Sequence, residues 1–204
     1  MAAPAFAAMK IQLLSDLHLE VDPAFVPEPA PEADVLVLAG DIGALPESTM
    51  GAHGTEDWCL TRFAPVLARW PVPVLYVPGN HEFDGVDLDR SRERLRAVVE
   101  RLGITWLDRE IVVIDGVRFA GTTLWADFDA LSDRPDGQPG ALAYNLQMRE
   151  KAFRAANWYL ERAATLRGGR LFDAEAMREE GLACQAWLRA ALATAHAGPT
   201  VVVT

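Results

Sequence analysis

Three short apolar runs, each followed at once by a polar cluster, constrain this chain more than any other feature. The runs cover residues 10–14, 34–39 and 74–77. The second and third runs are continuous and rich in valine and leucine, which is typical of strands that are buried on both faces of a sheet. Such strands predict an α/β fold, in which ligands gather at the carboxyl ends of the strands.

The polar clusters supply carboxylate, imidazole and amide side chains at those strand ends. Asp16 and His18 follow the first run, Asp41 follows the second, and Asn80 and His81 follow the third. Each cluster alone has a simpler explanation, because aspartate, asparagine and glycine are common in turns and caps. The three clusters together predict one site with mixed oxygen and nitrogen ligands. Such ligands suit Mn²⁺, Fe²⁺, Mg²⁺ or Zn²⁺.

The same motifs resemble those of the calcineurin-like metallophosphoesterase superfamily. The stretches MKIQLLSDLHLE, VLVLAGDIG, VPGNHE and FAGTTLWADF look like its bacterial members, and the resemblance runs from Met9 to Thr204. It implies a two-sheet α/β sandwich flanked by helices. It also implies a metal-dependent phosphoesterase that hydrolyses phosphomonoester or phosphodiester bonds, using two divalent metal ions to activate a water molecule.

The resemblance also implies a role for each motif residue. Asp16 and His18 would bind the first metal ion, Asp41 would bridge both ions, and Asn80 would bind the second. His81 would be the catalytic residue, because it would lie near the leaving group and could donate a proton or hydrogen bond to it. No substrate-binding residue follows from the motifs.

The chain departs from the family's pattern in its later part. Family members carry further histidine motifs after a strand that resembles the valine-rich segment of residues 200–204, where this sequence ends. We therefore expect a metallophosphoesterase domain over residues 9–204 that is incomplete at its C-terminus, with weak metal binding and reduced hydrolysis. A catalytically inactive binding scaffold of the same fold is the alternative. The two remaining histidines, His53 and His196, are expected to lie at the surface.

A second departure concerns the subclass. Ala44 and Leu45 stand where protein serine/threonine phosphatases carry an aspartate and an arginine, which argues against that subclass. Ala44 also stands where purple acid phosphatases carry a metal-binding tyrosine.

Composition narrows the choice of partner. The 19 basic and 29 acidic residues give a net charge of −10, which disfavours nucleic acid and a nuclease function and leaves a small phosphoester as the expected substrate. The sequence contains no apolar run long enough to cross a membrane. Cys59 and Cys184 form no disulfide framework, which favours a cytoplasmic protein. Residues 1–8 are expected to form a disordered extension.

The rest of the chain predicts helices and a β segment around this frame. The pair Asp115-Gly116 predicts a hairpin turn. The arginine-rich stretch 90–96 is interpreted as a solvated helix face. Trp106, Trp125 and Phe128 are interpreted as core aromatics, with a contribution of Trp125 and Asp127 to a substrate wall as the alternative. The helix over 143–166 is interpreted as a packing helix or cap, with a dimer interface as the alternative. The expected helices cover residues 56–70, 87–102, 143–166 and 174–196, and the expected strands cover 104–107, 110–114, 117–123 and 200–204.

Overall fold

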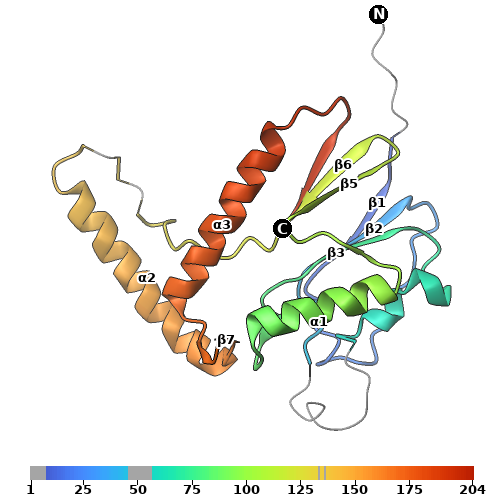
Figure 1. The fold of residues 1–204 in the computed structure, drawn as a ribbon, viewed down its shortest axis with the longest axis horizontal. Coiled ribbons are helices and arrows are strands. Elements are labelled where there is room, and N and C mark those ends of the chain that lie inside the picture. Colours follow the sequence, from blue (N-terminus) through green and yellow to red (C-terminus); the bar gives the residue numbers. More distant parts are fainter. Residues whose placement is uncertain (1–7, 46–56, 133, 136) are drawn as a thin grey trace, which may run out of the picture.

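Two main β-sheets, a two-stranded hairpin and three α-helices make up the computed structural model of the chain, which describes residues 8–45, 57–132, 134–135 and 137–204 (Figure 1). The predicted mixed α/β sandwich is confirmed. His53, and all but the last residue of the expected N-terminal extension, lie outside the described residues.

The first sheet is parallel and has the strand order β1-β2-β3-β4. Its strands are β1 (Ile11–Leu14), β2 (Val35–Ala39), β3 (Val74–Val77) and β4 (Thr105–Trp106). Every residue of β3 and all but the last of β2 are buried. These runs are continuous in the sequence because both faces of the central strands are covered.

The second sheet faces the first. Its order is β5-β6-β9, with β5 (Glu110–Ile114) antiparallel to β6 (Val117–Gly121) and β9 (Thr200–Val203) parallel to β6. Asp115 and Gly116 both have positive φ, as the predicted hairpin turn requires. The layer between the sheets is an apolar cluster built on Val35, Val37, Leu75, Val77, Leu107, Val117, Phe119 and Val203.

Helix α1 (Leu88–Arg101) packs on the other face of the parallel sheet, where a second apolar cluster contains Leu36, Leu38, Tyr76, Leu95 and Val99. The Asp87 side chain caps its N-terminus by accepting a hydrogen bond from the Arg90 N–H. Gly103 follows its C-terminus with a φ of 73°, as the sequence predicted.

The expected helix over residues 56–70 is wrong. The described part of this segment forms two short 3-10 helices, η2 (Leu60–Phe63) and η3 (Pro65–Leu67). Pro65 explains the break, because a proline disfavours helical backbone in the residue before it, and Ala64 is indeed extended.

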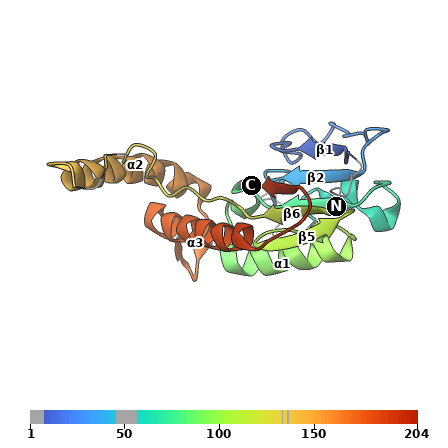
Figure 2. The same ribbon diagram turned by 90° about the horizontal axis from the view of Figure 1, so that it is seen from above.

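Helices α2 (Ala141–Ala163) and α3 (Ala174–Ala193) lie to one side of the two sheets (Figures 1 and 2). Both end three residues before the predicted position. After α2 the chain forms a small hairpin that the sequence did not predict, β7 (Leu166–Arg167) with β8 (Arg170–Leu171). The predicted Asp173 cap of α3 is present, since its side chain accepts from the Ala176 N–H.

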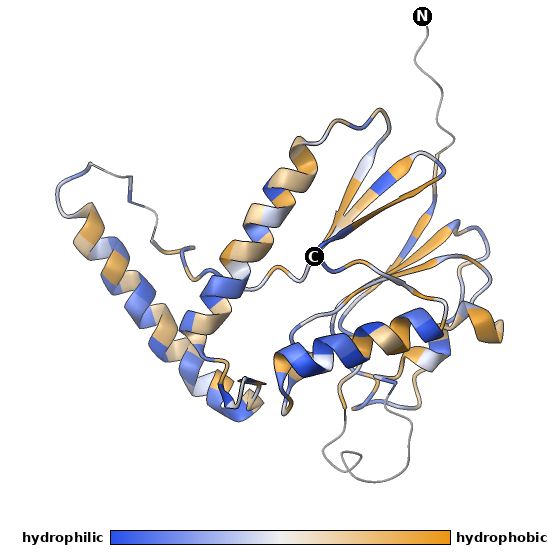
Figure 3. Ribbon diagram, viewed as in Figure 1, coloured by the Kyte–Doolittle hydropathy of each residue, from blue (hydrophilic) through white to orange (hydrophobic). Residues whose placement is uncertain are grey.

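Hydropathy separates these parts of the molecule. The strands of both sheets are mainly hydrophobic, whereas α2 alternates hydrophobic and hydrophilic residues along its length (Figure 3). Ala141 and Leu160 are the buried residues of α2, while Leu142 and Trp158 are 75% and 64% exposed. The packing role expected for this helix therefore involves few of its residues, which include one at each end. Among the described residues, no helix is long and apolar enough to span a membrane.

Candidate metal centre

The carboxyl ends of β1, β2 and β3 meet at one edge of the parallel sheet, and the three polar clusters follow there. The loop after β1 continues to pair with the loop after β2, because the Asp16 N–H donates to the Gly40 carbonyl at 3.0 Å and the His18 N–H to the Asp41 carbonyl at 3.1 Å. Asp41 also reaches the third loop, since its Oδ1 accepts from the His81 N–H at 3.0 Å. Two backbone hydrogen bonds and one from the His81 N–H to the Asp41 carboxylate thus hold the three clusters together.

The backbone at this edge is held in an unusual conformation. Asp16, His18 and Asp41 have φ values of 53°, 44° and 53°, in the left-handed region that L-residues seldom occupy. Aspartate and histidine tolerate this region better than most residues, but the conformation remains costly. Three such residues at adjacent strand ends are typical of a functional site, where surrounding structure maintains local strain.

Gly79 is required because two of the loops approach closely. A Cβ atom at Gly79 would lie 2.1 Å from Asp41 Oδ1 and 2.6 Å from the Asp41 nitrogen. Those contacts are shorter than any real Cβ contact, so a side chain here would push Asp41 away. Gly79 therefore lets the Asp41 carboxylate lie against the loop that carries Asn80 and His81.

Three of the five predicted site residues converge directly. One ligand atom from each of His18, Asp41 and His81 lies within 4.8 Å of the other two. The two imidazole rings meet edge to face, with centroids 4.8 Å apart. Asp16, Asp41 and Asn80 line the cavity beside this cluster. All five residues thus lie at one edge, and an imidazole–carboxylate–imidazole set fits a divalent metal ion of the first transition row or zinc.

His18 and His81, the two histidines of this cluster, each have a carboxylate partner at Nδ1. Asp84 Oδ2 lies 2.7 Å from His81 Nδ1, and Glu20 Oε1 lies 3.3 Å from His18 Nδ1. A carboxylate at Nδ1 orients the ring and leaves Nε2 for a metal ion or a substrate. The Tyr159 hydroxyl, from α2, lies 3.4 Å from His81 Nε2. Burial, with the neighbouring charges of Asp84 and Asp41, raises the pKa of Tyr159.

The Glu82 carboxylate holds together the loops that follow β2 and β3. Its Oε2 accepts from the Gly79 N–H at 2.8 Å and the Asp41 N–H at 3.1 Å, and its Oε1 accepts from the Ile42 N–H at 2.8 Å. Burial and the nearby Asp41 carboxylate raise the pKa of Glu82 to about 7, against the effect of these N–H donors.

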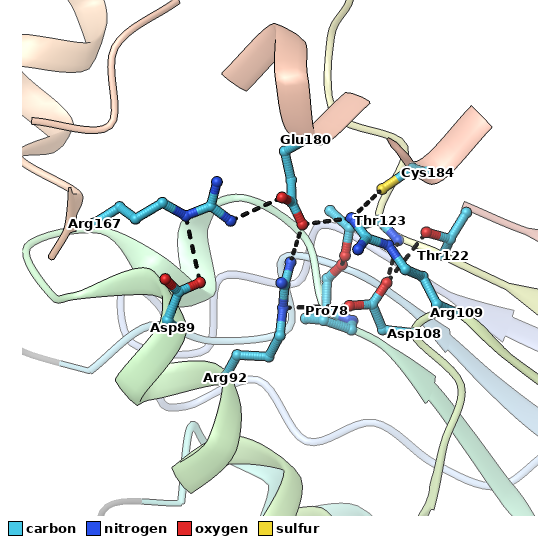
Figure 4. Close-up of polar contacts among 10 residues, drawn as sticks. All are labelled: Pro78, Asp89, Arg92, Asp108, Arg109, Thr122, Thr123, Arg167, Glu180 and Cys184. Carbon is cyan, nitrogen blue, oxygen red and sulfur yellow. Dashed lines mark hydrogen bonds and ion pairs between the residues drawn. The ribbon is translucent and has the colours of Figure 1, made fainter. Parts of the chain in front are cut away.

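A second brace reaches the same loop from the other sheet. The Thr123 hydroxyl donates to the Pro78 carbonyl at 2.6 Å, and the Asp108 carboxylate accepts from the Thr123 N–H at 3.0 Å. Asp108 in turn faces Arg92, whose guanidinium also contacts Glu180 of α3 (Figure 4). The loop before Asn80 is therefore linked to the junction of α1 and α3.

Glu180 is the centre of that junction. Its carboxylate is bound by the guanidinium groups of Arg92, Arg109 and Arg167, which come from three different segments (Figure 4). Burial alone would raise its pKa, but the hydrogen bond from Arg167 and the charges of Arg92 and Arg109 lower the pKa below its ordinary value. Arg92 corrects the interpretation of residues 90–96 as a solvated face, because its side chain points into this network.

The sequence missed the residues that support the site. Glu82 and Asp84 stand beside the predicted cluster, and the GNHE motif could have directed attention to Glu82. Tyr159 and Thr123 carried no local signal, since their proximity to the site arises from the packing of α2 and β6. His196 lies beyond α3, where its Nε2 is 3.0 Å from the Gly116 carbonyl. Trp106 and Trp125 are buried, as predicted.

The fold and this edge together define an α/β protein with a candidate metal centre at the ends of parallel strands. Residues 9–142 match the calcineurin-like phosphoesterase family, which is more than half of the chain. The chain therefore belongs to that family, whose members are usually hydrolases that use divalent metals. No curated protein matches the chain.

Proposed function

We propose that this protein hydrolyses small phosphomonoesters or phosphodiesters with the help of two divalent metal ions. The observation that supports this most directly is the convergence of His18, Asp41 and His81 within 4.8 Å. The cavity beside them is lined by Asp16 and Asn80, which adds a carboxylate and an amide oxygen to the donor set. Family membership supports the same class of reaction.

In this proposal Asp16, His18, Asp41 and Asn80 would hold the metal ions, and Asp41 would be shared by both. When bound, such ions supply positive charge that polarises a phosphoryl oxygen and acidifies a water molecule. Glu82 accepts from the Asp41 N–H, the His81 N–H donates to the Asp41 carboxylate, and Gly79 leaves room for that carboxylate. His81, oriented by Asp84, presents Nε2 to the leaving-group oxygen and donates a proton or a hydrogen bond to it.

The test compares acid-to-amide variants at matched positions. In the presence of Mn²⁺, wild-type protein is assayed with p-nitrophenyl phosphate and bis(p-nitrophenyl) phosphate. Loss of a group that merely supports a metal ligand lowers activity by roughly 10–100-fold. Asp41 is itself a proposed ligand, so Asp41→Asn is expected to lower kcat/KM by more than about 100-fold. Glu161→Gln removes one charge from an exposed position on α2 and serves as the control.

His81→Ala separates binding from catalysis. We expect it to lower kcat while Mn²⁺ binding, measured by calorimetry, is reduced less than in Asp41→Asn. If wild-type protein bound Mn²⁺ and the Asp41→Asn variant did not, yet neither hydrolysed any ester, the binding scaffold would replace the enzyme. Equal hydrolysis by wild type and Asp41→Asn would refute the metal-centred reaction.

A further inference from the structure

The cavity beside the candidate metal centre extends well beyond it. Its volume is about 590 Å³, and it runs from the strand ends to the inner faces of α2 and α3. Sites of this size commonly hold whole small molecules, so there is room for much more than a phosphoryl group. The far part of the cavity belongs to elements outside the three motif loops.

The far part is apolar and aromatic. Its lining includes Leu124, Trp125, Phe128, Leu160, Phe172 and Met177. Trp125 and Phe172 are 5% and 1% exposed, and their rings meet edge to face with centroids 5.2 Å apart. Phe128 packs in the same way on Phe153 at 5.3 Å. Because these rings are fixed by their neighbours, the wall exists before any ligand arrives and loses little freedom on binding.

The charges of the cavity have one sign. Within the part of the chain that the structure describes, neither lysine nor arginine lines it, whereas Asp16, Asp41 and Asp84 do. Metal ions at the strand ends would offset the carboxylates there and attract one phosphoryl group. A second anionic group on the substrate would meet no cationic side chain among the described lining residues, and would leave water for an apolar wall.

We infer that this site takes phosphate esters whose organic group is uncharged and apolar, of about the size of an aromatic ring, seated between α2, α3 and the segment that follows β6. This inference rests on the proposed function, which assigns the phosphoryl group to the metal centre. It adds the chemical class of the organic group that the ester carries. Among the described residues, the charged side chains that line the cavity are carboxylates, so esters that carry a further phosphate or carboxylate are expected to bind less well.

The inner face of α2 offers a matched pair of variants. Ala156 lines the cavity, and its neighbour Ala155 is exposed and does not. Ala156→Trp fills the apolar part, while Ala155→Trp adds the same side chain outside it. Phenylphosphonate and methylphosphonate, which cannot be hydrolysed at an ester bond, probe the cavity in the presence of Mn²⁺ by calorimetry.

Wild-type protein and Ala155→Trp are expected to bind phenylphosphonate at least about tenfold more tightly than methylphosphonate, because the ring buries apolar surface. Ala156→Trp is expected to lose most of that preference. Leu124→Asp is a second variant for the same purpose, because Leu124 lines the cavity yet is 46% exposed, so that a charge there is compatible with folding. Thermal unfolding by circular dichroism verifies the fold of each variant.

Parallel assays with phenyl phosphate and methyl phosphate separate the two proposals. Equal affinity of wild type for the two phosphonates, or a preference unchanged in both Ala156→Trp and Leu124→Asp, would overturn the assignment of the cavity even if both esters were hydrolysed. Absence of hydrolysis with the phenylphosphonate preference intact would instead refute the catalytic proposal and uphold the cavity's ligand class.

Discussion

The edge around Glu82 and the helix junction around Glu180 both enclose a glutamate, but they treat its charge in opposite ways. The two side chains are similarly buried, at 1% and 6% exposure. Burial and the nearby Asp41 carboxylate raise the pKa of Glu82 to about 7, although three backbone N–H groups donate to its carboxylate and act in the opposite direction. Glu180 receives three guanidinium groups, and its pKa is lowered.

This difference indicates that Glu82 positions the candidate metal ligands, whereas Glu180 stabilises the fold. The N–H groups around Glu82 belong to loops that carry candidate metal ligands, so this carboxylate fixes the geometry of the edge. The three arginines around Glu180 lie in α1, in the segment before β5, and in β7. The Glu180 carboxylate therefore joins α3 to the rest of the fold. Burial of an acid therefore says little about its role until its partners are known.

The largest effect on stability is expected at Glu180. Glu180→Leu leaves three arginines without their shared anion, and removal of one member of a buried ionic group costs about 3–5 kcal/mol. Glu179→Leu, at an exposed position on the same helix, is the control and should change the free energy of unfolding little. Urea denaturation followed by tryptophan fluorescence measures both. If Glu180→Leu lowered the free energy of unfolding by less than about 1 kcal/mol, Glu180 would not be a stabilising group of the kind that distinguishes it from Glu82.

Substitution of Glu82 should act on the metal site more than on the fold. Glu82→Gln replaces one acceptor oxygen by an NH₂ group that faces N–H donors, which costs about 1–3 kcal/mol. Mn²⁺ affinity is expected to fall by roughly 10–100-fold, as for other groups behind metal ligands. Calorimetric titration tests this, with Glu93→Gln on the exposed face of α1 as the control. Unchanged affinity would place Glu82 with Glu180 as a purely structural group.

Thr123 tests the link between the two regions. Thr123→Val removes the hydroxyl that donates to the Pro78 carbonyl and should cost about 1 kcal/mol. Thr123→Ser keeps the hydroxyl and should restore the free energy of unfolding and the Mn²⁺ affinity. If Val and Ser variants bound Mn²⁺ equally well, the brace would not contribute to the site.

The smallest change is expected when only the protonation of Glu180 is varied. Its folded-state pKa lies below the ordinary value of 4.5, so its carboxylate stabilises the fold fully above that value. The stabilisation is lost as the pH falls through the folded-state pKa. The difference in free energy of unfolding between wild type and Glu180→Gln should therefore narrow below pH 4.5. A difference that widened in acid would contradict the lowered pKa.

Local patterns predicted the parallel strands and the loops that follow them, because buried strands and their polar ends are adjacent in the sequence. The five predicted site residues all lie at that edge, although their roles as ligands and catalyst stay predictions. The supporting contacts could not be predicted in the same way. Glu180 meets Arg92 and Arg109 only after α3 has packed, and Tyr159 approaches His81 only through the placement of α2. The segment around Pro65 shows the opposite failure, where an apolar pattern suggested a helix that a proline prevents.

The left-handed backbone at Asp16, His18 and Asp41 has a consequence for how this edge should be mutated. Alanine in that conformation is strained, so an alanine scan would record backbone strain together with lost ligands. Asparagine accepts the conformation and removes only the charge. Glycine accepts it and removes the side chain altogether. Two variants at each aspartate, one with asparagine and one with glycine, would therefore separate the contribution of the carboxylate charge from that of the rest of the side chain.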